Sequence, residues 1–285
     1  MKTTFLVIVF LLSVAAAFAQ DVKPENTLIK QWETDPGLKV PESVLYDSAS
    51  GIIYVSNVDG KPAGKDSTGF ISTLSADGKI NNAQWVKGID APKGMGILNS
   101  HLFVSNIDEI VEIDIPSATI VNRYTVNGAQ FLNDVATDPA TGMVFITDSG
   151  TGKIFVLRDG TVNLWLEGAM FKGANGLFLR NNILYIGAGN SILQANIKSG
   201  EVTICVSNTG GVDGLYVTAD GKYIFSDWLG SVFMAGFKKK PELLLNTIAQ
   251  KANAADFGII PGQNMILIPT FSDNKVVSYR ASFIN

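Results

Sequence analysis

The chain has 285 residues, of which 46% are hydrophobic and 17% charged, and this composition excludes a disordered protein. A formal net charge of −4 argues against nucleic acid or an anionic membrane as a partner and favours small-molecule or cation ligands. Cys205 is the only cysteine and His101 the only histidine, which excludes an internal disulfide, a zinc site made of cysteines and any mechanism that needs two histidines.

The first residues are typical of an export signal. Lys2 precedes an apolar run over residues 5–14, and Ala17 and Ala19 are small residues at the positions that a signal peptidase reads. The run is too short to span a bilayer comfortably. The sequence therefore predicts a signal peptide over residues 1–19 and one domain over residues 20–285. We expect export to a periplasm or out of the cell, and no membrane attachment after cleavage.

Short strands and turns dominate the rest of the chain. A lone strand is expected over residues 27–32. After it, six runs share one signature: a turn, then apolar or β-branched residues, then small polar residues. These runs cover residues 51–56, 101–105, 143–147, 183–187, 223–226 and 265–269. No sustained helical period lies outside the predicted signal, so the fold class is all-β.

A second repeated element lies just before each run. Its second residue falls at six positions, 38 to 51 residues apart: Glu42, Lys93, Asn133, Asn175, Asp213 and Asp256. A repeat of about 40 residues matches one four-stranded blade of a propeller. The sequence thus predicts a six-bladed β-propeller. Only two strands follow Asp256, so the strand at residues 27–32 is expected to close the ring by joining the last blade.

Four of these positions suggest a metal site. The first strand of each blade lines the central channel, so Glu42, Asn133, Asn175 and Asp213 should converge from different blades. Carboxylate and amide oxygens suit one Ca²⁺ ion, and Mg²⁺, Mn²⁺ or Zn²⁺ would also be possible. The alternative is that Asn-Gly and Asp-Gly pairs simply form turns. Their constant place in the repeat favours the metal site.

These elements resemble a known family. Residues 41–44, 132–135, 174–177 and 212–215 are similar to motifs of the senescence marker protein 30, gluconolactonase and luciferin-regenerating-enzyme-like (SGL) family. The resemblance implies a six-bladed propeller with one divalent cation in its funnel. It implies that Glu42, Asn175 and Asp213 are metal ligands and that Asn133 contacts substrate or water. Phe131 stands where lactonases of the family often have an arginine, so gluconolactone is not assigned as the substrate.

The resemblance also implies hydrolysis of a small-molecule lactone or another ester. The cation would polarise the carbonyl group, and Asp213 or Glu42 would orient or deprotonate a water. A carboxylate bound to a dication is a poor base, so Asp134 or Asp256 is a possible substitute. Lys93 and Trp228 are further candidate substrate contacts.

A different class of function remains open. Propellers also serve as non-catalytic modules that bind a ligand or a protein, and here a metal ion would have a structural role. The sequence carries no oligomerisation signal, so we expect a monomer.

Overall fold

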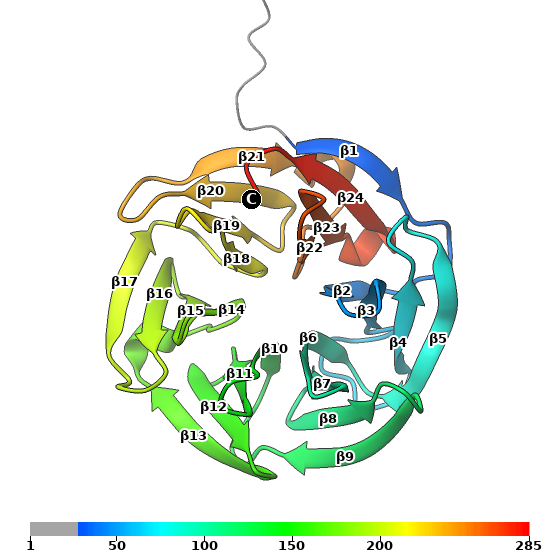
Figure 1. Cartoon of the computed structure of the whole chain (residues 1–285), viewed down its shortest axis with the longest axis horizontal. Helices are drawn as coiled ribbons and strands as arrows, with labels where there is room; N and C mark the ends of the chain where they lie inside the picture. Colours follow the sequence, from blue (N-terminus) through cyan, green and yellow to red (C-terminus); the bar gives the residue numbers. More distant parts are fainter. Residues whose placement is uncertain (1–27, 285) are drawn as a thin grey trace, which may run out of the picture.

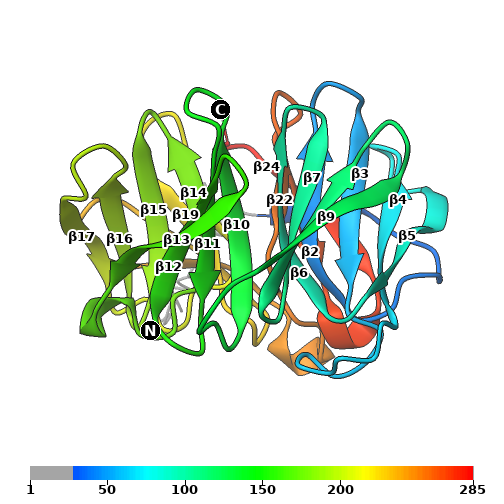
Figure 2. The ribbon, with the colours of Figure 1, turned by 90° about the horizontal axis from the view of Figure 1, so that it is seen from below.

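The computed structural model describes residues 28–284, which form a ring of six four-stranded antiparallel sheets around a central opening (Figure 1). Seen from the side, the strands span the thickness of the ring and the loops lie on its two faces (Figure 2). The all-β, six-bladed propeller predicted from the repeats is confirmed.

Five blades are built from four consecutive strands each. The first two blades are β2 (Pro41–Asp47), β3 (Ile52–Asn57), β4 (Gly69–Leu74) and β5 (Ile80–Ile89), then β6 (Pro92–Leu98), β7 (His101–Asn106), β8 (Glu109–Asp114) and β9 (Thr119–Thr125). The third is β10 (Leu132–Asp138), β11 (Met143–Asp148), β12 (Lys153–Arg158) and β13 (Thr161–Glu167). The fourth and fifth are β14 (Leu177–Arg180), β15 (Ile183–Ala188), β16 (Ser191–Asn196) and β17 (Val202–Ser207), then β18 (Leu215–Val217), β19 (Tyr223–Ser226), β20 (Ser231–Ala235) and β21 (Glu242–Asn246).

The sixth blade joins the two ends of the described chain. It contains β22 (Gly258–Ile260), β23 (Met265–Pro269) and β24 (Val276–Ala281), with β1 (Leu28–Glu33) as the outermost strand beside β24. The pairing is antiparallel from Leu28 opposite Ala281 to Glu33 opposite Val277. The predicted ring closure is therefore confirmed. Three short 3₁₀ helices, η1 (Ala169–Phe171), η2 (Ile248–Gln250) and η3 (Phe271–Asp273), lie in loops.

Burial changes from the inner to the outer strands of a blade. The second strands β3, β7 and β11 are buried along almost their whole length, whereas β9 and β13 on the outside are largely exposed. The second strands coincide with the six apolar runs in the sequence, because a strand packed between two neighbouring blades needs apolar side chains on both faces.

The hydrophobic cores lie between blades. In one cluster, Tyr54 and Ile71 of the first blade pack with Met95, Leu102 and Val104 of the second. Equivalent clusters occupy the other blade interfaces, so each blade covers the apolar face of the next one.

The predicted signal peptide lies outside the described residues and stays a prediction. In the part of the chain from Leu28 to Ile284, no helix has the length and apolar character needed to cross a membrane.

Candidate functional site

The four predicted oxygen donors lie around one cavity of about 260 Å³, together with Lys93 and Trp228. We call it the site cavity. Its lining comes from all six blades, so it lies on the ring axis at the N-terminal ends of the first strands. The residues that line it are Glu42, Val58, Pro62, Lys93, Phe131, Asn133, Asn175, Asp213, Trp228 and Phe271.

The glycines after Asn175 and Asp213 allow neighbouring blades to approach each other here. A Cβ atom on Gly176 would collide with the carbonyl oxygen of Asp213, and one on Gly214 would lie 2.6 Å from the backbone nitrogen of Phe257. Neither glycine has a positive φ, in contrast to the turn glycines Gly78 and Gly221. The Asn-Gly and Asp-Gly pairs of the site are therefore close-approach positions and not the turns of the alternative interpretation.

The side chains of the site leave acceptor oxygens without partners. Asn175 Nδ2 donates to Asp213 Oδ1 over 3.0 Å, and Asn133 Nδ2 donates to Ser149 Oγ over 3.1 Å. Glu42 Oε2 and Asn175 Oδ1 are buried, and neither accepts a hydrogen bond from the protein. A buried polar atom without a partner costs about 1–3 kcal/mol, so these two oxygens are free to contact a bound ion, ligand or water.

The pKa shifts of the two carboxylates in the site cavity also favour a bound ligand, in this case a cation. Burial and the nearby Asp213 carboxylate raise the pKa of Glu42 well above its ordinary value, and Lys93 only partly opposes them. Burial also raises the pKa of Asp213 to about 7, despite the hydrogen bond from Asn175. Both shifts show that negative charge is poorly compensated at this place, which a bound cation would correct.

The donor set fits a hard divalent cation. Among residues 28–284, no group of three or more histidine, cysteine, aspartate or glutamate side chains is placed to hold a metal. The site cavity instead combines two carboxylates, Glu42 and Asp213, with two amides, Asn133 and Asn175. Such oxygen-only sets suit calcium or magnesium better than softer metals.

Lys93 is almost completely buried, with 2% of its surface exposed. Its ammonium group donates to the carbonyl oxygens of Pro62, over 2.9 Å, and Ala91, over 3.1 Å, and lies 4.4 Å from the centre of the Phe131 ring. Burial lowers the pKa of Lys93 to about 8, although Glu42 acts in the opposite direction. Lys93 is therefore a buried residue of the site cavity and not a solvated surface lysine.

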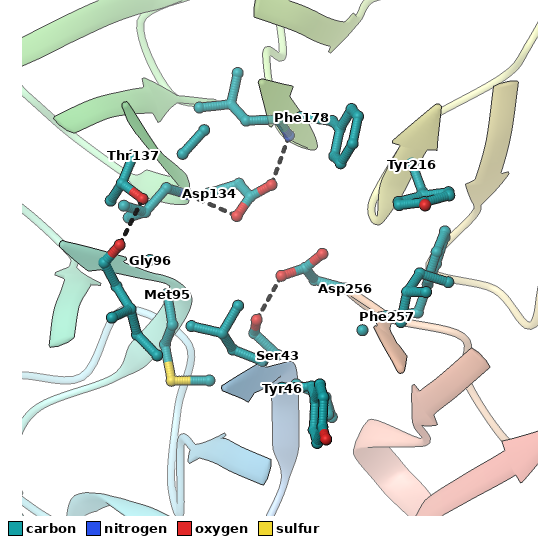
Figure 3. Close-up of a pocket in the computed structure, with 18 of the residues that line it drawn as sticks. Ser43, Tyr46, Met95, Gly96, Asp134, Thr137, Phe178, Tyr216, Asp256 and Phe257 are labelled. Carbon is teal, nitrogen blue, oxygen red and sulfur yellow. Dashed lines mark hydrogen bonds between the residues drawn. The ribbon is translucent and has the colours of Figure 1, made fainter. Parts of the chain in front are cut away.

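Asp134 and Asp256 face a different space. They line a cavity of about 450 Å³ along the C-terminal parts of the first strands, which we call the far cavity. Figure 3 shows both carboxylates pointing into the middle of this space, Asp256 between Ser43 and Phe257, and Asp134 on the side of Thr137 and Phe178. Asp134 accepts hydrogen bonds from the backbone amides of Val135 and Leu177, and Asp256 accepts one from Ser43 Oγ. Neither residue lines the site cavity, so neither is placed as the substitute base that the sequence suggested.

Sequence reasoning missed a set of hydroxyl groups behind the site. Ser105 on β7 donates to the carbonyl oxygen of Asn133, and Thr147 on β11 donates to that of Asn175 over 2.9 Å. Each hydroxyl group thus joins the second strand of one blade to the site residue of the next. The small polar residues at the ends of the apolar runs were the signal that could have identified them.

His101, the only histidine, does not line the site cavity. Its Nδ1 atom lies 2.6 Å from Glu112 Oε1 in the second blade. This contact gives it a structural partner away from the cavity.

Comparison with known proteins supports the fold alone. No protein-family model and no curated protein matches the chain. A crystal structure described as a nidogen/laminin complex matches with a TM-score of 0.60 and 15% sequence identity, over 72% of this chain and 80% of that chain. In all, 1136 chains of solved structures match, so the fold is widespread and does not select a function. The chain is a six-bladed β-propeller, and any activity must be argued from its site.

Proposed function

We propose that this protein is a metal-dependent hydrolase of lactones or other small esters, with one divalent cation, calcium by preference, held in the site cavity. The observation that carries the proposal is the pair of buried oxygens, Glu42 Oε2 and Asn175 Oδ1, that lack any partner in the protein. They lie beside a second buried carboxylate, Asp213, in a cavity on the ring axis. The SGL resemblance selects the same residues on independent grounds.

Glu42, Asn175 and Asp213 would hold the cation, with Asn133 beside it. When bound, the cation would act as a Lewis acid toward an ester carbonyl group and stabilise negative charge on its oxygen. Asn175 keeps Asp213 in place through the hydrogen bond between its Nδ2 and Asp213 Oδ1. Ser149 fixes the orientation of the Asn133 amide in the same way.

Glu42 and Asp213 are the carboxylates that can orient a water for attack, because they are the two that line the site cavity. Asp134 and Asp256 are better placed to position the site. The Asp134 carboxylate ties the strand that carries Asn133 to Leu177, two residues after Asn175. Asp256 ties the last blade to Ser43, next to Glu42.

Metal content is the first test. Purified protein should contain about one divalent cation per chain after mild dialysis, and added Ca²⁺ should raise the melting temperature of the chelated protein. The Asp213→Asn variant keeps the shape of the side chain but loses its charge, so it should lose the bound ion while remaining folded. Asp159→Asn, at an exposed turn, is the matched control and should retain the ion. Normal metal affinity in Asp213→Asn would refute the proposed site.

Hydrolysis is the second test. A panel of lactones and aryl esters should be turned over by the calcium-loaded protein and not by the chelated protein. If metal binds at the site but no member of the panel is hydrolysed, the protein is a binding module with a structural ion.

A further inference from the structure

The site cavity is polar at its floor and apolar at its rim. Its floor consists of Glu42, Lys93, Asn133 and Asp213, each less than 8% exposed, together with Asn175. Its rim consists of Pro62, Phe131, Trp228 and Phe271, which reach the surface, and Trp228 is 47% exposed. One exposed and two half-buried aromatic rings around a buried polar floor are the reverse of an ordinary protein surface, and such patches mark binding sites.

The aromatic rim is held in place by the protein. The rings of Trp228 and Phe271 meet edge to face, with centroids 5.4 Å apart. Asn253, which is 9% exposed, donates Nδ2 to the carbonyl oxygen of Trp228 over 2.8 Å, and its Oδ1 accepts from the Ser272 amide over 3.2 Å. One buried amide therefore connects the two loops that carry the rings. A large apolar ring fixed in this way can bind a ligand with little loss of conformational entropy.

One of the three N–H groups of the Lys93 ammonium remains free to donate a hydrogen bond. The Pro62 and Ala91 carbonyl oxygens accept the other two. Within residues 28–284, Lys93 forms no ion pair with a carboxylate. The Phe131 ring covers one side of the group, so the remaining donor is available at the cavity to an acceptor oxygen of a ligand.

We propose that the site cavity selects esters or lactones with a flat aromatic body, and that Lys93 is a specificity-determining residue that donates to an oxygen of the bound molecule. This inference rests on the proposed function. An aromatic ring would pack against Phe131, Trp228 and Phe271 while its ester group reaches the floor. A polyhydroxylated sugar lactone would instead place hydroxyl groups against this rim, where they would lose hydrogen bonds to water without replacement.

The kinetic test compares four substrates on the calcium-loaded protein: dihydrocoumarin, phenyl acetate, δ-valerolactone and δ-gluconolactone. We expect kcat/KM for the two aromatic substrates to exceed that for δ-gluconolactone by at least about tenfold. Trp228→Ala should raise KM for dihydrocoumarin by about tenfold with little change in kcat, because it removes binding away from the ester group. Its effect on KM for δ-valerolactone should be several-fold smaller, because that substrate has no aromatic body to pack against the indole ring. Leu164→Ala, at a comparably exposed site on β13, is the control and should change neither.

A binding test gives a readout that does not depend on turnover. The hydroxy acid formed by ring opening of dihydrocoumarin should change the tryptophan fluorescence of the calcium-loaded protein. Trp228→Ala should weaken that binding by about tenfold, and so should Lys93→Met, which keeps the length of the side chain but removes its charge. Circular dichroism and a melting curve of each variant would verify its fold.

The outcomes separate the two proposals. Preferred hydrolysis of δ-gluconolactone would overturn the aromatic specificity while leaving the hydrolase in place. Binding of the hydroxy acid without hydrolysis of any substrate would support the ligand class and overturn the hydrolase. Absence of both would overturn both proposals. Undiminished binding by Lys93→Met would overturn the role of Lys93.

Discussion

Glu112, a single buried carboxylate in the second blade, shows how the protein compensates charge away from the site. Its Oε2 accepts hydrogen bonds from Asn122 Nδ2 over 2.7 Å and from the Tyr124 hydroxyl over 2.6 Å, and its Oε1 lies 2.6 Å from His101 Nδ1. Burial opposes ionisation of Glu112, but these contacts outweigh it and lower its pKa. Glu42 differs because one of its oxygens has no partner at all. The contrast identifies Glu112 as structural, whereas the unpartnered oxygen of Glu42 supports the proposed cation site.

Glu112→Gln should reduce the free energy of unfolding by about 1–2 kcal/mol at pH 7, because the amide group cannot accept all three contacts. The lowered pKa stabilises the fold only where the carboxylate is ionised. That contribution is present above the ordinary glutamate value of 4.5 and is lost as the pH falls through the pKa of the folded state. Urea unfolding at pH 7 and pH 3 should therefore show a smaller difference between wild type and variant at pH 3. The exposed Glu201→Gln serves as control, and a difference that grows toward pH 3 would contradict the assignment.

The first strands are the elements that build the site, and their spacing depends on glycine. Gly94, Gly176, Gly214 and Gly258 each follow a repeat position by one or two residues. At each of them a Cβ atom would collide with the backbone of the next blade around the ring, in its first strand or just before it. Because only glycine permits so short a distance between two backbones, the pairs of neighbouring blades that meet at these four glycines approach each other closely at the axis. The oxygen donors are brought together as a consequence.

Gly176→Ala should separate Asn175 from Asp213, since the added methyl group would collide with the Asp213 carbonyl oxygen. We expect the variant to lose about 1–3 kcal/mol of stability through overpacking and to bind calcium more weakly. Gly211→Ala is a matched control in the loop before Asp213, where a Cβ atom meets nothing within 4 Å and φ is not positive. Calorimetric calcium titration together with thermal melting would measure both effects. Equal calcium affinity in the two variants would show that close approach at Gly176 does not position the site.

The repeat in the sequence predicts the place of some site residues and not of others. The phase of Glu42, Asn133, Asn175 and Asp213 in the repeat was sufficient to predict that they converge, because equivalent positions in a propeller share one distance from the axis. The same phase placed Asp256 with them, yet its carboxylate lines the far cavity instead. Asp256 pairs with Ser43, the residue after Glu42, and the Ser226 hydroxyl donates to Ala255 as the Ser105 hydroxyl does to Asn133. Asp256 therefore stands one residue beyond the equivalent position, and successive side chains of a strand point in opposite directions.

At the scale of the whole molecule, the ring is held together by its last blade. β1 pairs with β24, Lys275 Nζ lies 3.2 Å from Glu33 Oε1, and the backbone of Thr34 bonds to Val276 over 3.0 Å. Trp32 adds an apolar contact with the first blade, where it packs beside Leu38 and Val44. This closure was predictable from the sequence because the last blade has one strand too few after Asp256, where the structure has β22, β23 and β24, and one further strand precedes Glu42. It links β1 and β24 to the cavity, since Glu42 follows β1 by only a short loop.

Deletion of residues 1–34 should open the ring, because β24 would lose its neighbour and become an exposed edge. We expect the truncation to cost about 3 kcal/mol or more in the free energy of unfolding. The truncated chain should therefore melt at least about 6–12 °C lower than a chain that begins at residue 26. It should also aggregate in a concentration-dependent way. Trp32→Ala separates the contributions: it removes the packing of the indole ring but keeps the strand pairing, so it should lower the melting temperature without promoting aggregation. If the truncated chain melted at the same temperature and bound calcium normally, the ring would not need β1, and the position of Glu42 would depend on the first blade alone.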